Sequence, residues 1–289
     1  MSKYYCLIAG LPQISLEDGK PFYTVSSFKE ELGSVLTQGD QKLVGLFFLK
    51  YDNKNLLGCL GDADYKADAR GSFSIGEFQE GARSIKEEEP APKKSRLPSY
   101  MTDFLEMFMA SHVKGQSGDI SWEDRLSALY YAYAMKCRNK FVADWFELNL
   151  NINNMLTALT CRKYGLDKAK YIVGDNLVAD ALRKSTSRDF GLGDEVDYLP
   201  ELQRITEEND LMVREKKVDL LKWSWLEENT FFKTFDVESV FAYLLELEMV
   251  ERWATLDKAA GEKTFREIVR AMKKGSENAL EEFKRNNEK

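Results

Sequence analysis

The stretch that decides the fold is residues 47–60, FFLKYDNKNLLGCL, because its pattern recurs twice farther along the chain. Residues 146–159 read FELNLNINNMLTAL, and residues 231–244 read FFKTFDVESVFAYL. Each copy has a phenylalanine, an Asp or Asn five positions later, a short polar residue three positions after that, and a final leucine. The copies begin 99 and 85 residues apart, whereas solenoid repeats span ~20 to 50 residues. We therefore predict three related helical units arranged around a pseudo-threefold axis.

The polar positions of the repeat are the candidate functional residues. They are Asp52, Asn55, Asn151, Asn154, Asp236 and Ser239. An Asp or Asn followed by a polar residue three positions later is also typical of a helix start, where the side chain caps the backbone. Two interpretations stay open: a surface that contacts a partner, or side chains that serve their own helices.

Length and composition favour an all-α protein. The 289 residues are enough to bury a substantial core and to build two or three units. Six prolines, 31% charged residues and long runs rich in Leu, Ala, Glu and Lys suit helices far better than sheets. No region alternates apolar and polar residues for long enough to predict a sheet.

One stretch marks a boundary between units. Residues 84–99, SIKEEEPAPKKSRLPS, contain three prolines, a block of acids and a block of bases without apolar periodicity. Such a composition predicts an exposed linker or loop. We expect a first helical unit over residues 1–83, a second, built on a long helix, over 100–190, and a third over 191–289.

The strongest helical pattern follows this linker. Ser121 and Asp124 approximate a capping box, and apolar residues then recur every three or four positions up to Leu159. The pattern predicts one helix of roughly forty residues, or two nearly collinear helices broken near 149–154. Further helices are expected over 22–36, 41–60, 211–228, 237–257 and 262–284, two short ones within 167–184, and one from about Pro200. The opening YYCLIAGLP is compatible with a strand or a helical turn.

Charge, hydropathy and cysteine usage exclude several classes. The formal charge of −7 argues against a general nucleic-acid binder. No stretch approaches the ~18 consecutive apolar residues of a membrane span, and residues 1–20 lack a signal-peptide pattern. We expect a cytoplasmic protein without direct membrane insertion. The four cysteines stand far apart without a CxxC pair, which predicts reduced thiols buried in the core.

No catalytic, cofactor or metal motif is evident. The single histidine, His112, excludes the common zinc arrangements. Asp62, Asp64 and Asp68 lack the glycine that a calcium loop needs, and no P-loop is present. We expect a protein that is not an enzyme and that needs no cofactor. The alternative is an enzyme whose cleft brings together carboxylates from separate helices.

Three neighbouring tyrosines indicate contacts on more than one side of their helix. Tyr130, Tyr131 and Tyr133 are so close together on the predicted long helix that they cannot all face the same side. We expect some of them to face another helix or a protein partner.

Three phrases of the sequence resemble a known family. They are YYCLIAGLPQISLEDGK (4–20), NLNINNMLTALTCRKYG (149–165) and VESVFAYLLELEMVERWATLD (237–257). They are similar to the DUF2764 family, which is associated with V/A-type ATPases. More distantly, the three copies resemble the D-x-x-N-L helices of the C/d-type central-stalk family, which occurs in archaeal-type and eukaryotic rotary ATPases. In that family three similar helical units form a funnel, which sits on the membrane rotor ring and receives the foot of the central shaft.

The resemblance implies a non-catalytic central-stalk component of a V/A-type rotary ATPase, which would serve proton or sodium transport as part of the rotor. Its partners would be the shaft subunits and the membrane rotor ring, and it would lie at the cytoplasmic face of the membrane. Asn151 stands where the pattern has Asp, and Ser239 where it has Asn. The alternatives are a helical scaffold or regulatory protein unrelated to the ATPase and, third, a cleft enzyme.

Overall fold

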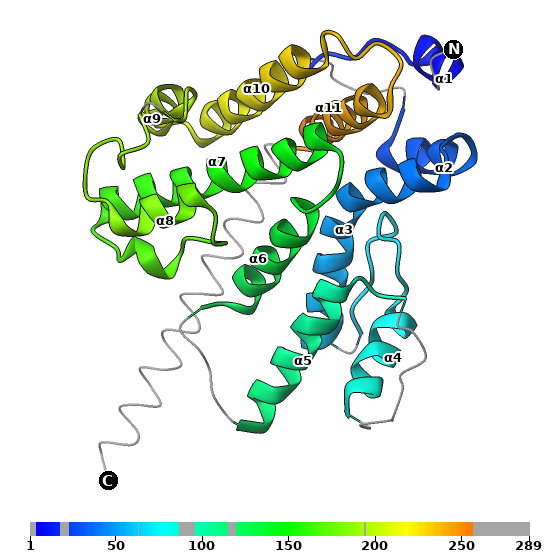
Figure 1. Ribbon diagram of the computed structural model, residues 1–289, viewed down its shortest axis with the longest axis horizontal. Coiled ribbons are helices and arrows are strands. Elements are labelled where there is room, and N and C mark those ends of the chain that lie inside the picture. The colour runs from blue at the N-terminus through cyan, green and yellow to red at the C-terminus, as the bar shows by residue number, and fades with distance from the viewer. Residues whose placement is uncertain are drawn as a thin grey trace. The chain divides into compact units, whose positions relative to one another are not determined.

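The fold is all-α, as predicted. A computed structural model describes residues 4–17, 23–62, 64–86, 96–114, 120–193 and 195–256. Over these residues the chain forms eleven α-helices and one short 3-10 helix, with no strand (Figure 1). The helices are α1 Tyr5–Gly10, α2 Val25–Val35, α3 Gln38–Gly61, α4 Ile75–Lys86, α5 Ser99–Lys114, α6 Trp122–Ala134, α7 Lys140–Tyr164, η1 Lys168–Lys170, α8 Leu177–Lys184, α9 Leu199–Thr206, α10 Leu211–Thr230 and α11 Val237–Thr255.

The chain divides into two compact units. The first comprises Met1–Leu11 and Ser26–Tyr243, and the second comprises Pro12–Val25 and Leu244–Lys289. The linker predicted over 84–99 begins within the last turn of α4, and its residues 87–95 lie outside the described part of the chain. The helix predicted over 262–284 also lies outside it.

Polar side chains define where several helices begin. The Oγ of Ser121 accepts a hydrogen bond from the backbone N–H of Asp124 at 3.1 Å, which starts α6 as the sequence predicted. Asn176 caps α8 in the same way. Helix α7 ends at Gly165, whose φ of 65° is a left-handed conformation that glycine adopts without strain.

The predicted forty-residue helix is two helices that fold against each other. Asn139 lies between α6 and α7, and its Oδ1 accepts a hydrogen bond from the N–H of Val142 at 3.1 Å, which starts a new helix. The ring centroids of Tyr130 and Phe146 are 5.6 Å apart, so α6 packs beside α7 and is not collinear with it. The two helices diverge visibly in direction (Figure 1).

The break predicted near 149–154 was wrong. These residues lie in the middle of α7, where Asn149 donates from Nδ2 to the carbonyl of Trp145 at 2.8 Å. Asn151 and Asn154 are buried and bond to groups outside the helix. Their amides therefore do not compete with the helical backbone, which was the reason to expect a break.

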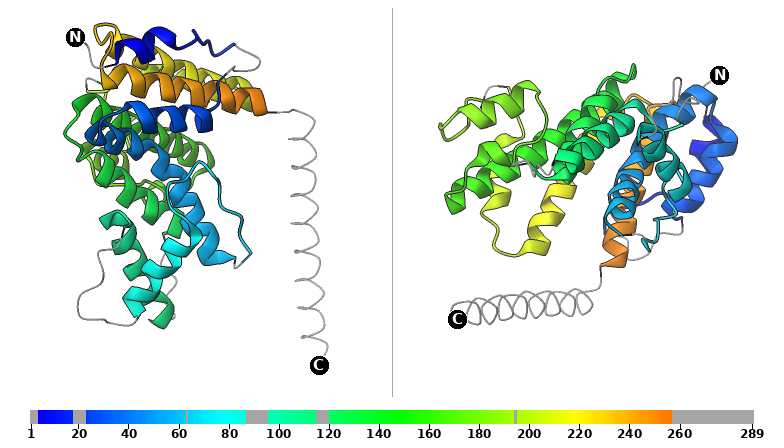
Figure 2. Two further views of the ribbon diagram at one scale, coloured as in Figure 1. Left: turned by 90° about the vertical axis from the view of Figure 1, so that its right-hand side faces the viewer. Right: turned by 90° about the horizontal axis from the view of Figure 1, so that it is seen from below.

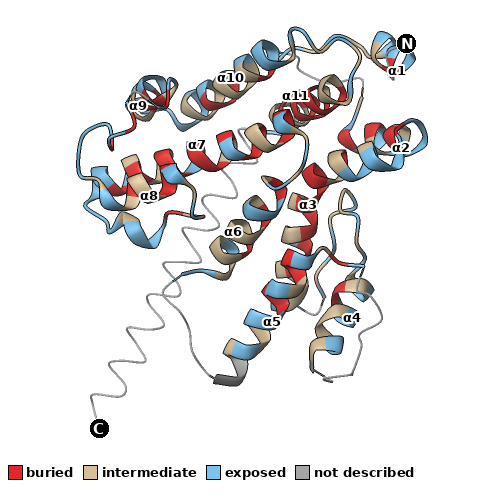
Figure 3. Ribbon diagram, in the orientation of Figure 1, coloured by how far each residue is buried: buried red, intermediate tan, exposed pale blue. Residues whose placement is uncertain are grey.

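The core of the first unit is aromatic and centres on α3 and α7. Both helices carry long buried stretches (Figure 3). The ring of Phe141 stacks on that of Trp225 at 5.5 Å, and Phe146 approaches Phe241 at 6.4 Å. These contacts join α7 to α10 and to the start of α11. Helix α5 lies beside both α4 and α6 (Figure 2).

In the second unit, the later part of α11, within the helix expected over 237–257, buries an apolar stripe. Leu244, Leu247 and Val250 are fully buried. The N–H of Val25 donates to the carboxylate of Glu251 at 2.7 Å. This stripe is therefore a core face of the second unit.

All four cysteines are free thiols, as expected, but only one is in the core. Cys161 is buried, Cys59 and Cys137 are half-buried, and Cys6 is exposed. Within the described ranges, no cluster of three or more His, Cys, Asp or Glu side chains could hold a metal ion. No helix in those same ranges is long and apolar enough to cross a membrane.

Candidate functional site

The first copy of the repeat holds the loop that follows its own helix. Asn55 is fully buried in α3; its Oδ1 accepts the N–H of Asp68 at 2.7 Å, and its Nδ2 donates to the carbonyl of Asp68 at 3.0 Å. One turn earlier, the Oδ1 of Asp52 accepts the N–H groups of Ser72 and Phe73 at 2.6 and 3.0 Å. The loop backbone is not part of a helix, and the side chains of Asn55 and Asp52 form hydrogen bonds with its polar groups.

The second copy repeats this arrangement. The Oδ1 of Asn154 accepts the N–H of Val173 at 2.9 Å, and its Nδ2 donates to the carbonyl of Val173 at 2.7 Å. The Oδ1 of Asn151 accepts a hydrogen bond from Nδ2 of Asn176 at 2.8 Å. We call the pairs Asn55 with Asp68 and Asn154 with Val173 the amide clamps. Each clamp joins a long helix to the loop that leads into the next α-helix.

The third copy has a different position. Asp236 is exposed and directly precedes α11, and Ser239 lies in the first turn of that helix. Phe231, which aligns with the buried Phe47 and Phe146, is 76% exposed. The third match therefore lies at a helix start, which is the alternative that the residue pattern allowed.

The structure divides the six predicted contact residues into two groups. Asp52, Asn55, Asn151 and Asn154 are buried and bond to this chain's own loops. Their side chains are therefore not accessible to a partner in this structure. Asp236 is exposed and Ser239 is half-buried.

A buried carboxyl, that of Asp52, lies one helical turn from Asn55 of the first clamp. Burial raises the pKa of the Asp52 carboxyl above its ordinary value, and its Oδ2 has no hydrogen-bond partner within the described part of the chain. Lys29, whose pKa burial lowers, donates to the carbonyls of Arg70 and Gly71 at 2.7 Å each.

A Cβ on Gly71 would lie 2.7 Å from both Nδ2 of Asn55 and Oδ1 of Asp52. The clamp therefore needs glycine at this position.

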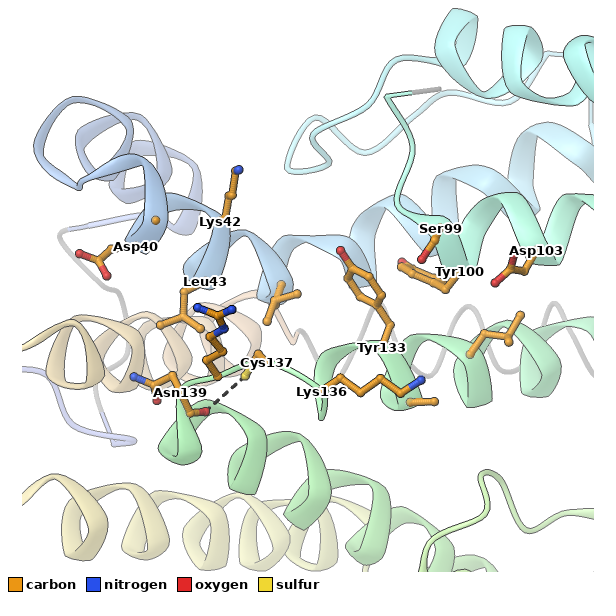
Figure 4. Close-up of a pocket in the computed structure, with 15 residues that line it drawn as sticks. Asp40, Lys42, Leu43, Ser99, Tyr100, Asp103, Tyr133, Lys136, Cys137 and Asn139 are labelled. Carbon is orange, nitrogen blue, oxygen red and sulfur yellow. Dashed lines mark hydrogen bonds between the residues drawn. The ribbon is translucent and has the colours of Figure 1, made fainter. Parts of the chain in front are cut away.

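A groove of about 820 Å³ lies between α3, α5, α6 and the segment that joins α6 to α7 (Figure 4). Its apolar lining residues are Leu43, Leu46, Leu129 and Ala132. Exposed cationic residues Lys42, Lys136 and Arg138 also line it, and none of them forms an ion pair with another described residue. The groove thus combines an aliphatic surface with free positive charge.

Two acidic residues, Asp40 and the exposed Asp103, and two tyrosines also line the groove. Oδ2 of Asp40 accepts hydrogen bonds from the hydroxyls of Thr37, at 2.7 Å, and Tyr4. The ring centroids of Tyr133 and Tyr100 are 5.1 Å apart, and the two side chains lie next to each other in Figure 4. Burial raises the pKa of the Tyr100 hydroxyl, which donates to Oδ1 of Asn53 at 2.7 Å. Tyr100 therefore stays protonated and does not supply a general base.

The three neighbouring tyrosines of α6 face different surroundings, as expected. Tyr130 is buried and donates to the carbonyl of Leu46 at 2.9 Å. Tyr131 receives a hydrogen bond from Nδ2 of Asn153 at 3.4 Å. Tyr133 is 36% exposed and lines the groove. Sequence reasoning missed the groove because its residues come from three helices, and because Lys136 and Arg138 fell inside the predicted long helix.

The comparisons with known proteins give one family. No curated protein and no solved structure matches the chain. The family model described as "Protein of unknown function (DUF2764)" matches residues 1–276, which is nearly the whole length. The chain therefore belongs to the DUF2764 family.

Proposed function

We propose that the protein is a non-catalytic central-stalk component of a V/A-type rotary ATPase, similar in role to the C/d-type family, that couples the central shaft to the membrane rotor ring. The observation that carries this proposal is the repetition of the amide clamp in two helices of one chain. The likeness of Asn55 and Asn154 thus extends from sequence to hydrogen bonds, which supports a protein built from related helical units.

The clamps also suit mechanical coupling. An element that transmits torque has to be stiff, and each clamp ties a long helix to the following loop through two hydrogen bonds. Close packing of the aromatic core adds to this stiffness. Such a role needs neither a cofactor nor a catalytic group.

The groove between α3, α5 and α6 would bind one of the partners. Its aliphatic surface fits the apolar face of an amphipathic helix, and Lys42, Lys136 and Arg138 fit carboxylates on the flanks of that helix. Shaft and ring subunits are the partners that this function requires, and the protein would lie on the cytoplasmic side of the membrane through them.

The test is purification of the tagged protein from native membranes under mild detergent and low salt. Recovery of rotary ATPase subunits is the expected result, and Lys42→Glu with Arg138→Glu should reduce it because both groove charges reverse. Lys184→Glu, an exposed lysine of α8, is the matched control. Recovery without any ATPase subunit would reject the proposal. Robust ATP hydrolysis by the purified chain would reject its non-catalytic part.

One observation favours a second candidate, a helical scaffold or regulator unrelated to the ATPase. The third copy of the repeat lies at a helix start and forms no clamp there among the described residues. The identity of the recovered partners separates the two candidates, because a scaffold would bring other proteins from the same membranes.

A further inference from the structure

The turn between α10 and α11 carries two phenylalanines that are almost fully exposed. Phe231 is 76% exposed and Phe232 is 89% exposed, and their rings meet edge to face with centroids 4.9 Å apart. Burial of two adjacent aromatic rings provides a large favourable free energy, which these rings lack while they are exposed to water. Exposed apolar groups that gather in one place mark interaction sites more often than single ones do.

The turn that carries these rings is anchored. The N–H of Lys233 donates to the carbonyl of Thr230 at 2.7 Å. The ring of Phe235 packs on that of Tyr5 at 4.8 Å, and the N–H of Tyr4 donates to the carbonyl of Phe235 at 3.3 Å. Helix α1 therefore holds the base of the turn.

The surroundings of the two rings are acidic. Glu227 and Glu228 are exposed in the last turn of α10, where no basic residue is present. Negative charges are unfavourable at a helix C-terminus, because the helix dipole is negative there. The nearby cation, Lys233, is paired with Glu238 at 3.7 Å. A partner surface that carries basic residues would offset the unfavourable negative charges of Glu227 and Glu228 at this helix end.

We propose that Phe231 and Phe232 form a docking knob that inserts into an apolar pocket with a basic rim on another subunit of the rotary ATPase. This inference rests on the proposed function and adds the contact surface and the chemistry of the partner. The acidic flank favours a protein over a lipid bilayer, whose cytoplasmic surface carries negative charge. Aromatic side chains are the usual anchors of such interfaces.

The experiment measures binding of the full chain to detergent-solubilised V/A-type ATPase prepared from cells that lack this chain. The double variant Phe231→Ser, Phe232→Ser should bind at least about tenfold more weakly than the wild type. Leu177→Ser is the matched control, because Leu177 is 82% exposed on α8, and it should bind within about twofold of the wild type. Glu227→Gln with Glu228→Gln should slow association and reduce its salt dependence.

Thermal denaturation of each variant checks the fold, and Phe232→Ser alone replaces the double variant if the double variant is destabilised. Wild-type binding that the Phe variants leave unchanged would overturn the knob while the proposed function stands. Failure of the wild type to bind the ATPase would overturn both. Binding of the wild type to vesicles of anionic lipid, lost in the Phe variants, would also overturn the protein-pocket assignment.

Discussion

The carboxamide of Asn55 pairs with both backbone groups of Asp68, thirteen residues away, and thereby acts as a substitute peptide group for the loop. Asn154 pairs in the same way with Val173 across nineteen residues. The two loops differ in length and sequence, yet the contact is the same. Each clamp satisfies a backbone N–H of its loop, and the second clamp also satisfies the C=O of Val173. The C=O of Asp68 additionally accepts a hydrogen bond from the N–H of Gly71 at 3.1 Å.

Removal of a clamp should destabilise the fold. We expect Asn55→Ala and Asn154→Ala each to lower the free energy of unfolding by about 2–4 kcal/mol, because each leaves a loop N–H without its partner and removes a second hydrogen bond to the loop carbonyl. Asn153→Ala is the matched control; this neighbour is exposed, and its cost should stay within about 0.5 kcal/mol. Urea denaturation measures all three. Equal costs for Asn153→Ala and Asn154→Ala would contradict a stabilising clamp.

The glycine at position 71 offers a steric test of the first clamp. Gly71→Ala should cost about 1–3 kcal/mol of unfolding free energy, because its Cβ would press against Nδ2 of Asn55 in the clamp and against Oδ1 of the neighbouring Asp52. Gly45→Ala, within α3 and with no atom in the way, should be neutral or stabilise by up to about 1 kcal/mol. Chemical denaturation compares the two. Similar values for both variants would show that the loop moves away at little cost.

The buried carboxyl of Asp52 predicts a pH dependence. Because its pKa is raised above 3.8, the folded protein retains a proton that the unfolded chain releases. Its contribution to stability is complete below pH 3.8 and is lost as the pH rises through the folded-state pKa. Asp52→Asn, which copies the residue at position 151, should remove this dependence. The wild type should therefore lose stability relative to the variant from about pH 4 toward neutrality.

Denaturation at a series of pH values measures this difference. A wild type that gains stability relative to Asp52→Asn over the same range would mean that the hydrogen bonds from the N–H groups of Phe73 and Ser72, together with attraction to Lys29, outweigh the cost of burial. The sign of the slope thus distinguishes the two effects on one carboxyl.

Alanine substitutions of two leucines, one in α11 and one in α7, should differ in their effect on the free energy of unfolding. Leu244 is fully buried, so Leu244→Ala should lower the free energy of unfolding by about 2–5 kcal/mol. Leu156 is half-buried beside a cavity of about 360 Å³, so Leu156→Ala should cost less than about 2 kcal/mol. Urea titration of both variants provides the comparison. A larger cost for Leu156 would indicate that this cavity is closed in solution.

Several elements could be predicted because their signals are local. Ser121 with Asp124 marked the start of α6, and the apolar residues that recur up to Leu159 marked the helical stretches of α6 and α7. Caps and apolar periodicity depend on residues within one or two turns of each other. The pairing of each repeat with a distant loop residue involves no such short spacing and was not predictable.

The sequence by itself determined the all-α class, most of the helix positions and the repetition of a polar pair, Asp52 with Asn55 and Asn151 with Asn154. Only the tertiary structure decided what those side chains do. A buried amide in mid-helix and a capping amide have the same local pattern, and the difference is whether a loop presents its backbone to them. The same reason explains the groove beside α6, because α3 lines it although α3 is distant from α6 in the sequence.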